Sequence, residues 1–249
     1  MKKFETLASI RERCQQCKMC INCALYDSKR VVFEDGNPNA QIMIIGQNPG
    51  EKEDELGIPF VGPSGQFLDK CLDLAKLSRQ NDVYITNAVK CHTVSNHKPN
   101  AKMYNPCWEY LKKQIDIIKP KVIMCLGNLA RQAVSKIILN KLKGLSSNIP
   151  KSNPPLVLFE SDNNIAKLEH IPNLYTAWAL KRDYGCPIVV VMYLIHPSER
   201  NLYRYGNDSV ADAYNFAFEL AKEYAKLRTN NINILEKRLL ERSFVVMPN

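Results

Sequence analysis

Four cysteines lie close together near the start of the sequence. The stretch "CQQCKMCINC" spaces them three residues apart, at Cys14, Cys17, Cys20 and Cys23. Two further cysteines, Cys91 and Cys107, are separated by fifteen residues. A Cys-x-x-Cys pair lets two thiolates bind one metal centre, as in structural zinc and iron–sulfur sites. The spacing therefore predicts a metal site, and it leaves both an iron–sulfur cluster and zinc open.

A second stretch with chemical potential is "GQNPGEKEDELGIPFVG", residues 46–62, which follows an apolar run. It is rich in Gly, Pro and carboxylates, and its most confined part holds the amides Gln47 and Asn48. An amide is not a strong base, but it donates and accepts hydrogen bonds. If this loop forms an active site, we expect it to orient a reactant and not to abstract a proton.

Four short runs rich in β-branched residues are predicted to be strands, over 40–47, 82–89, 121–127 and 187–195. Each is almost continuously apolar, as is typical of strands buried on both faces of a parallel sheet. Helical patterns lie between or after these runs, over 64–77, 106–119, 128–143 and 208–227. The alternation predicts an α/β, three-layer sandwich with a central four-stranded parallel sheet, whose ligands bind at the carboxyl ends of the strands.

The whole chain, 1–249, is expected to be a single domain. The Ser-, Asn- and Pro-rich segment 144–185 fits the alternation poorly and is predicted to be an insertion. The end, 230–249, is predicted to be a short amphipathic helical tail. The Cys-rich segment 14–23 precedes the first predicted strand.

The composition favours a polyanionic partner. The formal net charge is +9, which suits nucleic acid first and an anionic membrane surface second. The apolar runs are much shorter than the ~20 residues that span a bilayer, so no membrane association is expected. The start of the chain has no apolar core of a secretory signal. We therefore expect a cytoplasmic protein whose cysteines bind metal or lie in the core, without disulfides.

The motifs together resemble family 4 uracil-DNA glycosylases, the iron–sulfur branch of their superfamily. The matching stretches are "GQNPGEKEDELGIPFVGPSGQFL" (46–68), "VYITNAVKC" (83–91), "IIKPKVIMCLGNLA" (117–130) and "HPS" (196–198). The resemblance implies hydrolysis of the N-glycosidic bond of uracil in single- or double-stranded DNA, leaving an abasic site. It also implies a 4Fe-4S cluster held by Cys20, Cys23, Cys91 and Cys107, with Cys14 and Cys17 as extra cysteines. We expect a monomer.

The resemblance also assigns roles to residues of the predicted loops. Asn48 would orient the attacking water, and His196 would donate to uracil O2 as negative charge develops there. The base would be bound by Gln47, Glu53, Phe60 and Asn87. The stretch "HPSERNLYRYGND" would contact DNA through Ser198, Arg200, Tyr203 and Arg204. We expect Lys90, Lys98 and Lys102 on the same DNA-binding face.

The sequence departs from the family pattern at two places. Gln47 and Asn48 stand where family 4 usually has Glu and Ala, and "CHTVSNHKP" (91–99) replaces a Cys-Arg-Pro-Pro stretch. His97 in the second place matches a histidine that bonds covalently to the sugar in a related branch, a minor alternative. The departures leave two other functions open: a catalytically weak or inactive DNA-binding relative, and a glycosylase with altered base specificity.

Overall fold

The computed structural model of the protein describes residues 5–143, 158–159, 165–166, 169–171, 175–180 and 189–226. The predicted C-terminal tail, 230–249, lies outside these residues. Of the predicted insertion, 144–185, only four short strands are described. Among the described helices, none is long and apolar enough to cross a membrane.

The centre of the fold is a sheet of four parallel strands in the order β3-β2-β4-β9. Their bounds are β2 Ile42–Gly46, β3 Val83–Asn87, β4 Val122–Leu126 and β9 Val189–Leu194. Every residue of β2, β3 and β4 is buried, which explains why their sequences are apolar without alternation. The four strands predicted from the sequence are therefore confirmed.

Short antiparallel strands extend both edges of this parallel sheet. β1 (Asp35–Gly36) pairs with β3, while β8 (Tyr175–Leu180) pairs with β9 and β7 (Glu169–Ile171) pairs with β8. The sheet thus has seven strands among the described residues. β5 (Leu158–Phe159) and β6 (Ile165–Ala166) form a separate pair. Strands within 144–185 were not indicated by the sequence pattern, and whether this segment is an insertion stays a prediction.

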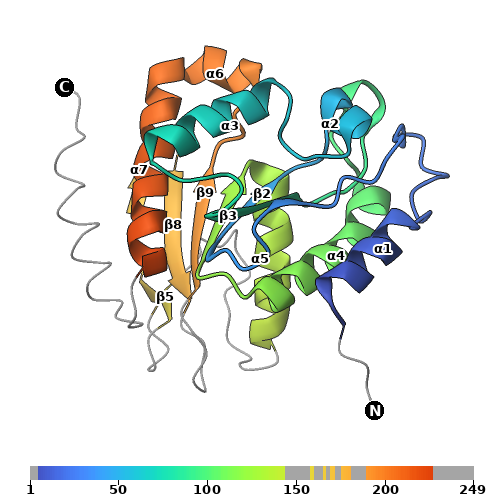
Figure 1. Cartoon of the computed structure of the whole chain (residues 1–249), viewed down its shortest axis with the longest axis horizontal. Helices are drawn as coiled ribbons and strands as arrows, with labels where there is room; N and C mark the ends of the chain where they lie inside the picture. The colour runs from blue at the N-terminus through green and yellow to red at the C-terminus, as the bar shows by residue number, and fades with distance from the viewer. Residues whose placement is uncertain are drawn as a thin grey trace.

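Helices cover both faces of the sheet (Figure 1). One side holds α3 (Pro63–Leu74), α6 (Glu199–Tyr205) and α7 (Asn207–Lys226), and the other holds α1 (Leu7–Gln15), α4 (Ala101–Ile118) and α5 (Asn128–Lys143). Side chains of β2 alternate between the two cores: Ile44 packs with α3 and α7, whereas Met43 and Ile45 pack with α4 and α5. The predicted three-layer α/β sandwich is confirmed.

Helix α4 begins earlier than its sequence suggests. It starts at Ala101, not at Pro106, because the Asn100 side chain caps it by accepting a hydrogen bond from the Lys102 backbone N–H. Pro106 consequently lies inside the helix and cannot donate to the carbonyl of Lys102. That carbonyl is free to accept another donor.

Candidate active site

A cavity of about 630 Å³ opens at the carboxyl ends of the parallel strands. Loops after β2, β3 and β9 line it, together with the short helix α2 (Glu51–Leu56) and the starts of α3 and α6. Eight predicted site residues are among its lining: Gln47, Asn48, Glu53, Phe60, Asn87, His196, Ser198 and Arg200. Tyr203 and Arg204 are exposed on α6, outside the lining. The fold therefore brings together residues that are distant in sequence.

Phe60 and Asn87 meet over a glycine of β2. Gly46 lies opposite Asn87 in the sheet. A Cβ atom on Gly46 would be 2.3 Å from Asn87 Oδ1 and 2.4 Å from the Phe60 ring, so only glycine leaves room for both groups. Phe60 has a left-handed backbone (φ 55°), and Gly65 accommodates its carbonyl. The aromatic ring and the amide are consequently fixed side by side at the cavity.

Glu53 connects the two ends of the loop after β2. Its Oε2 accepts the N–H of Gly50 (3.0 Å), and its Oε1 accepts those of Val61 (2.8 Å) and Gly62 (2.6 Å). The side chain lines the cavity, yet both of its oxygens bind backbone amides. Its geometry is that of a group that shapes the loop, and its predicted contact with the base stays a prediction.

The Asn48 amide is oriented by the turn that follows β3. Its Nδ2 donates to the carbonyl of Pro49 (3.0 Å) and lies 3.5 Å from Thr93 Oγ1. His92 Nδ1 lies 3.1 Å from the same Pro49 carbonyl. Among the residues that the structure describes, no donor bonds to Asn48 Oδ1. This oxygen is therefore available to accept a hydrogen bond from a molecule in the cavity.

His196 lies at the end of β9, opposite Phe60. The two ring centroids are 6.4 Å apart, and their planes differ by 28°. Burial lowers the pKa of His196 to about 4, although the nearby Glu53 acts in the opposite direction. A Cβ atom on Gly127 would be 2.9 Å from Gln47 Nε2 and 3.0 Å from His196 Cβ, which places Gln47 beside the histidine. Near neutral pH, His196 is an uncharged ring with one N–H to donate.

The turn after β3 adds one residue to the cavity and leaves His97 outside its lining. Asn96, which was not predicted, lines the cavity, and both Ser95 and Asn96 have left-handed backbones. His97 is exposed, is not among the lining residues, and places its Nδ1 2.7 Å from the Val94 carbonyl. The left-handed pair could have been suspected only from the Ser-Asn dipeptide, since Asn tolerates this conformation.

Lys90 does not lie on a DNA-binding face, contrary to the prediction. It is 1% exposed, and burial lowers its pKa to about 8. Lys98 and Lys102, in contrast, are exposed. A lysine after a strand normally reaches solvent, whereas Lys90 finds its hydrogen-bond acceptors inside the protein.

The cysteines predicted as ligands are buried in one apolar cluster with β2, α4 and α5. They are Cys20, Cys23, Cys91 and Cys107. The Cys20 thiol lies 3.6 Å from the Lys102 carbonyl that Pro106 leaves free. Burial raises the pKa of Cys107 to about 12 and that of Cys91 well above its ordinary value. The described residues contain no group of three or more metal-binding side chains already arranged around one point.

The extra cysteines are not members of this apolar cluster, but both lie near enough to it to act on the pKa of Cys91. Cys14, near the end of α1, is buried in a small core with Ile10 and Phe33. Cys17 is partly exposed. Four buried thiols in one cluster are the donor set that zinc and iron–sulfur centres require, and they fit such a centre chemically. Any bound cation would have to displace protons that burial makes hard to lose.

Comparisons with known proteins agree with this geometry. The family model of the uracil DNA glycosylase superfamily matches residues 33–219. The type-4 uracil-DNA glycosylase of Sulfurisphaera tokodaii is 36% identical over 149 residues, covering 59% of this chain and 64% of that protein. The corresponding protein of Archaeoglobus fulgidus is 37% identical over 129 residues, covering 51% and 64%.

A third relative, the type-4 uracil-DNA glycosylase of Thermotoga maritima, is 33% identical over 165 residues. That alignment covers 62% of this chain and 85% of the relative, whereas the first two relatives are matched over just under two thirds of their length. The matched family region contains the whole cavity, from Gln47 to Asn201. The chain therefore belongs to the uracil DNA glycosylase superfamily and resembles its type-4 members.

Proposed function

We propose that the protein is a uracil-DNA glycosylase that acts in base-excision repair. It hydrolyses the N-glycosidic bond between uracil and deoxyribose and leaves an abasic site. The observation that carries this proposal is the cavity itself, which unites an aromatic face, a buried amide, a neutral histidine and an oriented asparagine. These are the groups that recognition and release of a flipped pyrimidine require.

Recognition of the base follows from Phe60 and Asn87. A uracil turned out of the helix stacks on the Phe60 ring, whose position is fixed by the left-handed turn. The Asn87 amide is 2% exposed and lies at the cavity, where it can donate to uracil O4 and accept from N3–H. Cytosine presents the opposite donor and acceptor at these two atoms, so the same amide orientation disfavours it.

Bond cleavage uses His196 and Asn48. As the bond from C1′ to N1 breaks, its electron pair moves onto the uracil, and negative charge develops on O2. The neutral His196 N–H donates to this oxygen without giving up its proton. Asn48 Oδ1 accepts a hydrogen bond from water and holds it near C1′, and the water proton passes to solvent or to the departing uracil. A cationic sugar needs only a well-placed weak nucleophile, so an amide suffices.

The DNA strand would cross the exposed side of the cavity. Ser198 and Arg200 line the rim, and Tyr203, which is 94% exposed, and Arg204 project from α6 next to it. Arginine binds phosphate, and an exposed tyrosine can stack on an unpaired base. The net charge of +9 supports binding to a polyanion. We infer that the protein acts as a monomer on single- or double-stranded uracil-containing DNA.

A 4Fe-4S cluster on Cys20, Cys23, Cys91 and Cys107 is part of the proposal. Hydrolysis transfers no electrons, so the cluster would supply structural order and no redox step. Zinc is the alternative for the same thiols. Iron and sulfide analysis of protein purified without oxygen separates them: about four of each per chain supports the cluster, and zinc without sulfide contradicts it.

The experiment that tests the function measures uracil release and DNA binding on one preparation. Single-stranded DNA and duplex DNA with a U·G pair are each supplied first at a concentration above that of the enzyme and then at a concentration below it. Release of free uracil, with abasic sites formed in equal amount, is the expected result. Tight DNA binding without release would favour the inactive relative, and release of another deaminated base in place of uracil would favour altered specificity.

A further inference from the structure

Lys90 is a buried ammonium whose three protons all have acceptors. Its Nζ donates to Thr86 Oγ1 (2.6 Å), to the Asn87 carbonyl (2.7 Å) and to Gln114 Oε1 (2.6 Å). Within the part of the chain that the structure describes, it forms no ion pair with a carboxylate. All three hydrogen-bond acceptors are neutral, and the Phe33 ring lies 5.5 Å from the ammonium, so hydrogen bonds and a cation–π contact hold the charge in place.

Burying such a group is costly, because an ammonium loses its hydration. A methionine of similar length would fill the same space without this cost. The hydrogen bonds of Lys90 must therefore have a role other than filling space, such as fixing the positions of the groups that accept them. One of them holds the last carbonyl of β3, which belongs to Asn87, the residue whose amide faces the cavity.

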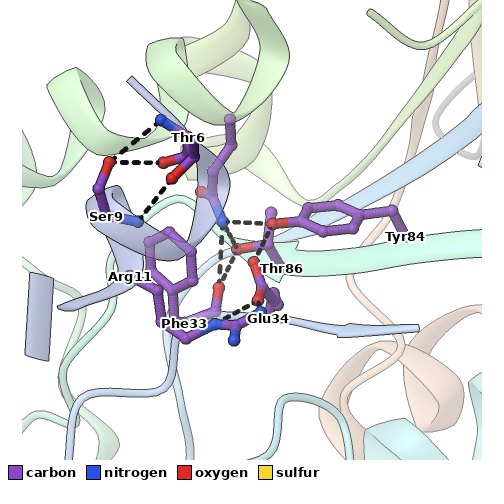
Figure 2. Close-up of polar contacts among 8 residues, drawn as sticks. Thr6, Ser9, Arg11, Phe33, Glu34, Tyr84 and Thr86 are labelled. Carbon is purple, nitrogen blue, oxygen red and sulfur yellow. Dashed lines mark hydrogen bonds and ion pairs between the residues drawn. The ribbon is translucent and has the colours of Figure 1, made fainter. Parts of the chain in front are cut away.

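The acceptors of Lys90 are themselves held in a polar network between β3 and α4. Gln114 Nε2 donates to the hydroxyl of Tyr84 (2.8 Å), and this hydroxyl donates to Glu34. Thr86 Oγ1 donates to the carbonyl of Phe33 (2.7 Å). Figure 2 shows Tyr84, Thr86, Phe33 and Glu34 converging, with Arg11 of α1 paired to Glu34 at the outer end. These contacts fix the orientation of the Gln114 amide: its Nε2 faces the Tyr84 hydroxyl, and its Oε1 faces Lys90.

We propose that Lys90 is a positioning residue for uracil excision, which fixes the Asn87 backbone and so the direction of the Asn87 amide into the cavity. The inference rests on the proposed function. Lys90 has no direct contact with the base in this account, since it is not among the residues that line the cavity. Its side chain acts through Asn87, whereas its backbone N–H, which substitution by Met keeps, bonds to the Cys107 thiol.

A double-mutant cycle tests this inference. Lys90→Met, Asn87→Ala and the double variant are compared with the wild type by single-turnover uracil release. A slightly misplaced group typically costs 10- to 100-fold in rate, so Lys90→Met should slow release by roughly that factor. In the Asn87→Ala background the same change should cost less than about 3-fold, because the residue through which Lys90 acts is gone. Binding to uracil-free DNA should stay unchanged.

Two controls separate positioning from general damage. Lys222→Met removes another lysine that donates to backbone carbonyls, those of Ala75 and Lys76, far from the cavity, and it should leave release unchanged. Iron content and visible absorbance of each variant show whether Lys90→Met has altered the cysteine centre. If Lys90→Met does not fold, Thr86→Val removes one acceptor and keeps the ammonium, with an expected loss of roughly 3- to 10-fold that also vanishes in Asn87→Ala.

The outcomes are distinguishable from a failure of the proposed function. A wild-type protein that releases no uracil would overturn that function together with this inference. A wild type that releases uracil, with effects of Lys90→Met and Asn87→Ala that simply multiply, would overturn the inference alone. Unchanged release in folded, iron-replete Lys90→Met would do the same.

Discussion

Two loops on opposite sides of the cavity are built in contrasting ways. The loop after β2, residues 47–62, is closed by backbone hydrogen bonds to the buried Glu53, and its glycines leave room for neighbouring side chains. The segment after His196 carries its charges and its aromatic ring outside, with Tyr203 94% exposed and no buried residue in α6. The loop 47–62 is held by internal hydrogen bonds, whereas the segment after His196 presents its side chains to solvent.

The two loops should therefore respond differently to substitution. A group that must meet a reacting atom tolerates little displacement, so substitutions that disturb the loop after β2 should reduce the rate. Exposed side chains that contact phosphates contribute individually modest, salt-dependent binding. Substitutions in α6 should therefore change affinity and leave the rate of the bound complex nearly intact.

The largest expected effect is that of Gly46→Ala. The added Cβ would lie within 2.4 Å of both the Asn87 amide and the Phe60 ring, and one of them must move. We expect single-turnover release to fall by at least about 100-fold. Gly62→Ala is the matched control, because its Cβ would meet Glu53 Oε1 at 3.2 Å, which a small shift relieves. Equal losses in the two variants would contradict the fixed arrangement.

Loss of a predicted cysteine ligand should also have a large effect, in this case on the metal content and the stability of the protein. If the proposed cluster is bound, Cys91→Ser is expected to remove most of the iron and to lower the melting temperature, because one of the four proposed thiolate ligands is then missing. Cys71→Ser, in the core on the other face of the sheet, should keep its iron. Cys14→Ser should keep it as well if the extra cysteines are idle. Iron analysis and thermal unfolding provide the measurement.

A smaller effect is expected for Glu53→Gln. A glutamine that keeps its oxygen toward Val61 and Gly62 turns its amino group toward the N–H of Gly50, two donors facing each other. We expect a loss of roughly 10-fold in single-turnover release, with unchanged affinity for DNA. Faster amide hydrogen exchange of the loop 47–62 should accompany it. A change in thymine release without loss on uracil would instead indicate direct contact with the base.

Substitutions in α6 should act on affinity. Arg200→Ala and Tyr203→Ala are each expected to weaken binding by roughly 3- to 10-fold. The slope of log affinity against log salt should fall by about one for Arg200→Ala and stay unchanged for Tyr203→Ala. If these variants released uracil more slowly even at saturating enzyme concentration, it would be wrong that α6 affects only binding while the loop 47–62 sets the rate.

The smallest expected effect is on the pH dependence of the reaction. Burial keeps the pKa of His196 near 4, so its charge should not change between about pH 5.5 and 8 and it should add no inflection there. Stability behaves differently. The unfolded state binds a proton near pH 6.5 and the folded state only near 4, so stability falls as pH drops through that window. An inflection near pH 6.5 in the release rate that His196→Asn abolishes would contradict this assignment.

Much of the site was predictable from the sequence because its residues follow strands with strong signals. The continuous apolar runs located β2, β3, β4 and β9. Motif resemblance pointed to Asn48, Phe60, Asn87 and His196, which line the cavity and whose roles stay predictions. Two-residue strands such as β1 give no usable pattern, since two residues cannot show a periodicity. The position of the helix α4 start was hidden because a proline normally marks a first turn, whereas Asn100 supplies the cap.

Features that depend on distant partners could not be predicted. The burial of Lys90 requires Gln114 from α4, and nothing in "NAVKC" indicates that this acceptor will be present. The use of both Glu53 oxygens by the loop likewise depends on the turn at Phe60. Asn96 reaches the cavity only because two consecutive residues adopt left-handed backbones.

Single-turnover release of uracil by the wild type and by Asn48→Ala shows whether this cavity excises uracil with water held by the Asn48 amide. We expect the wild type to release uracil and the variant to bind the same DNA while its release falls by at least about 100-fold, because water is no longer held at the sugar. If Asn48→Ala keeps full activity, the amide does not orient the nucleophile and the assignment of this cavity wall is wrong.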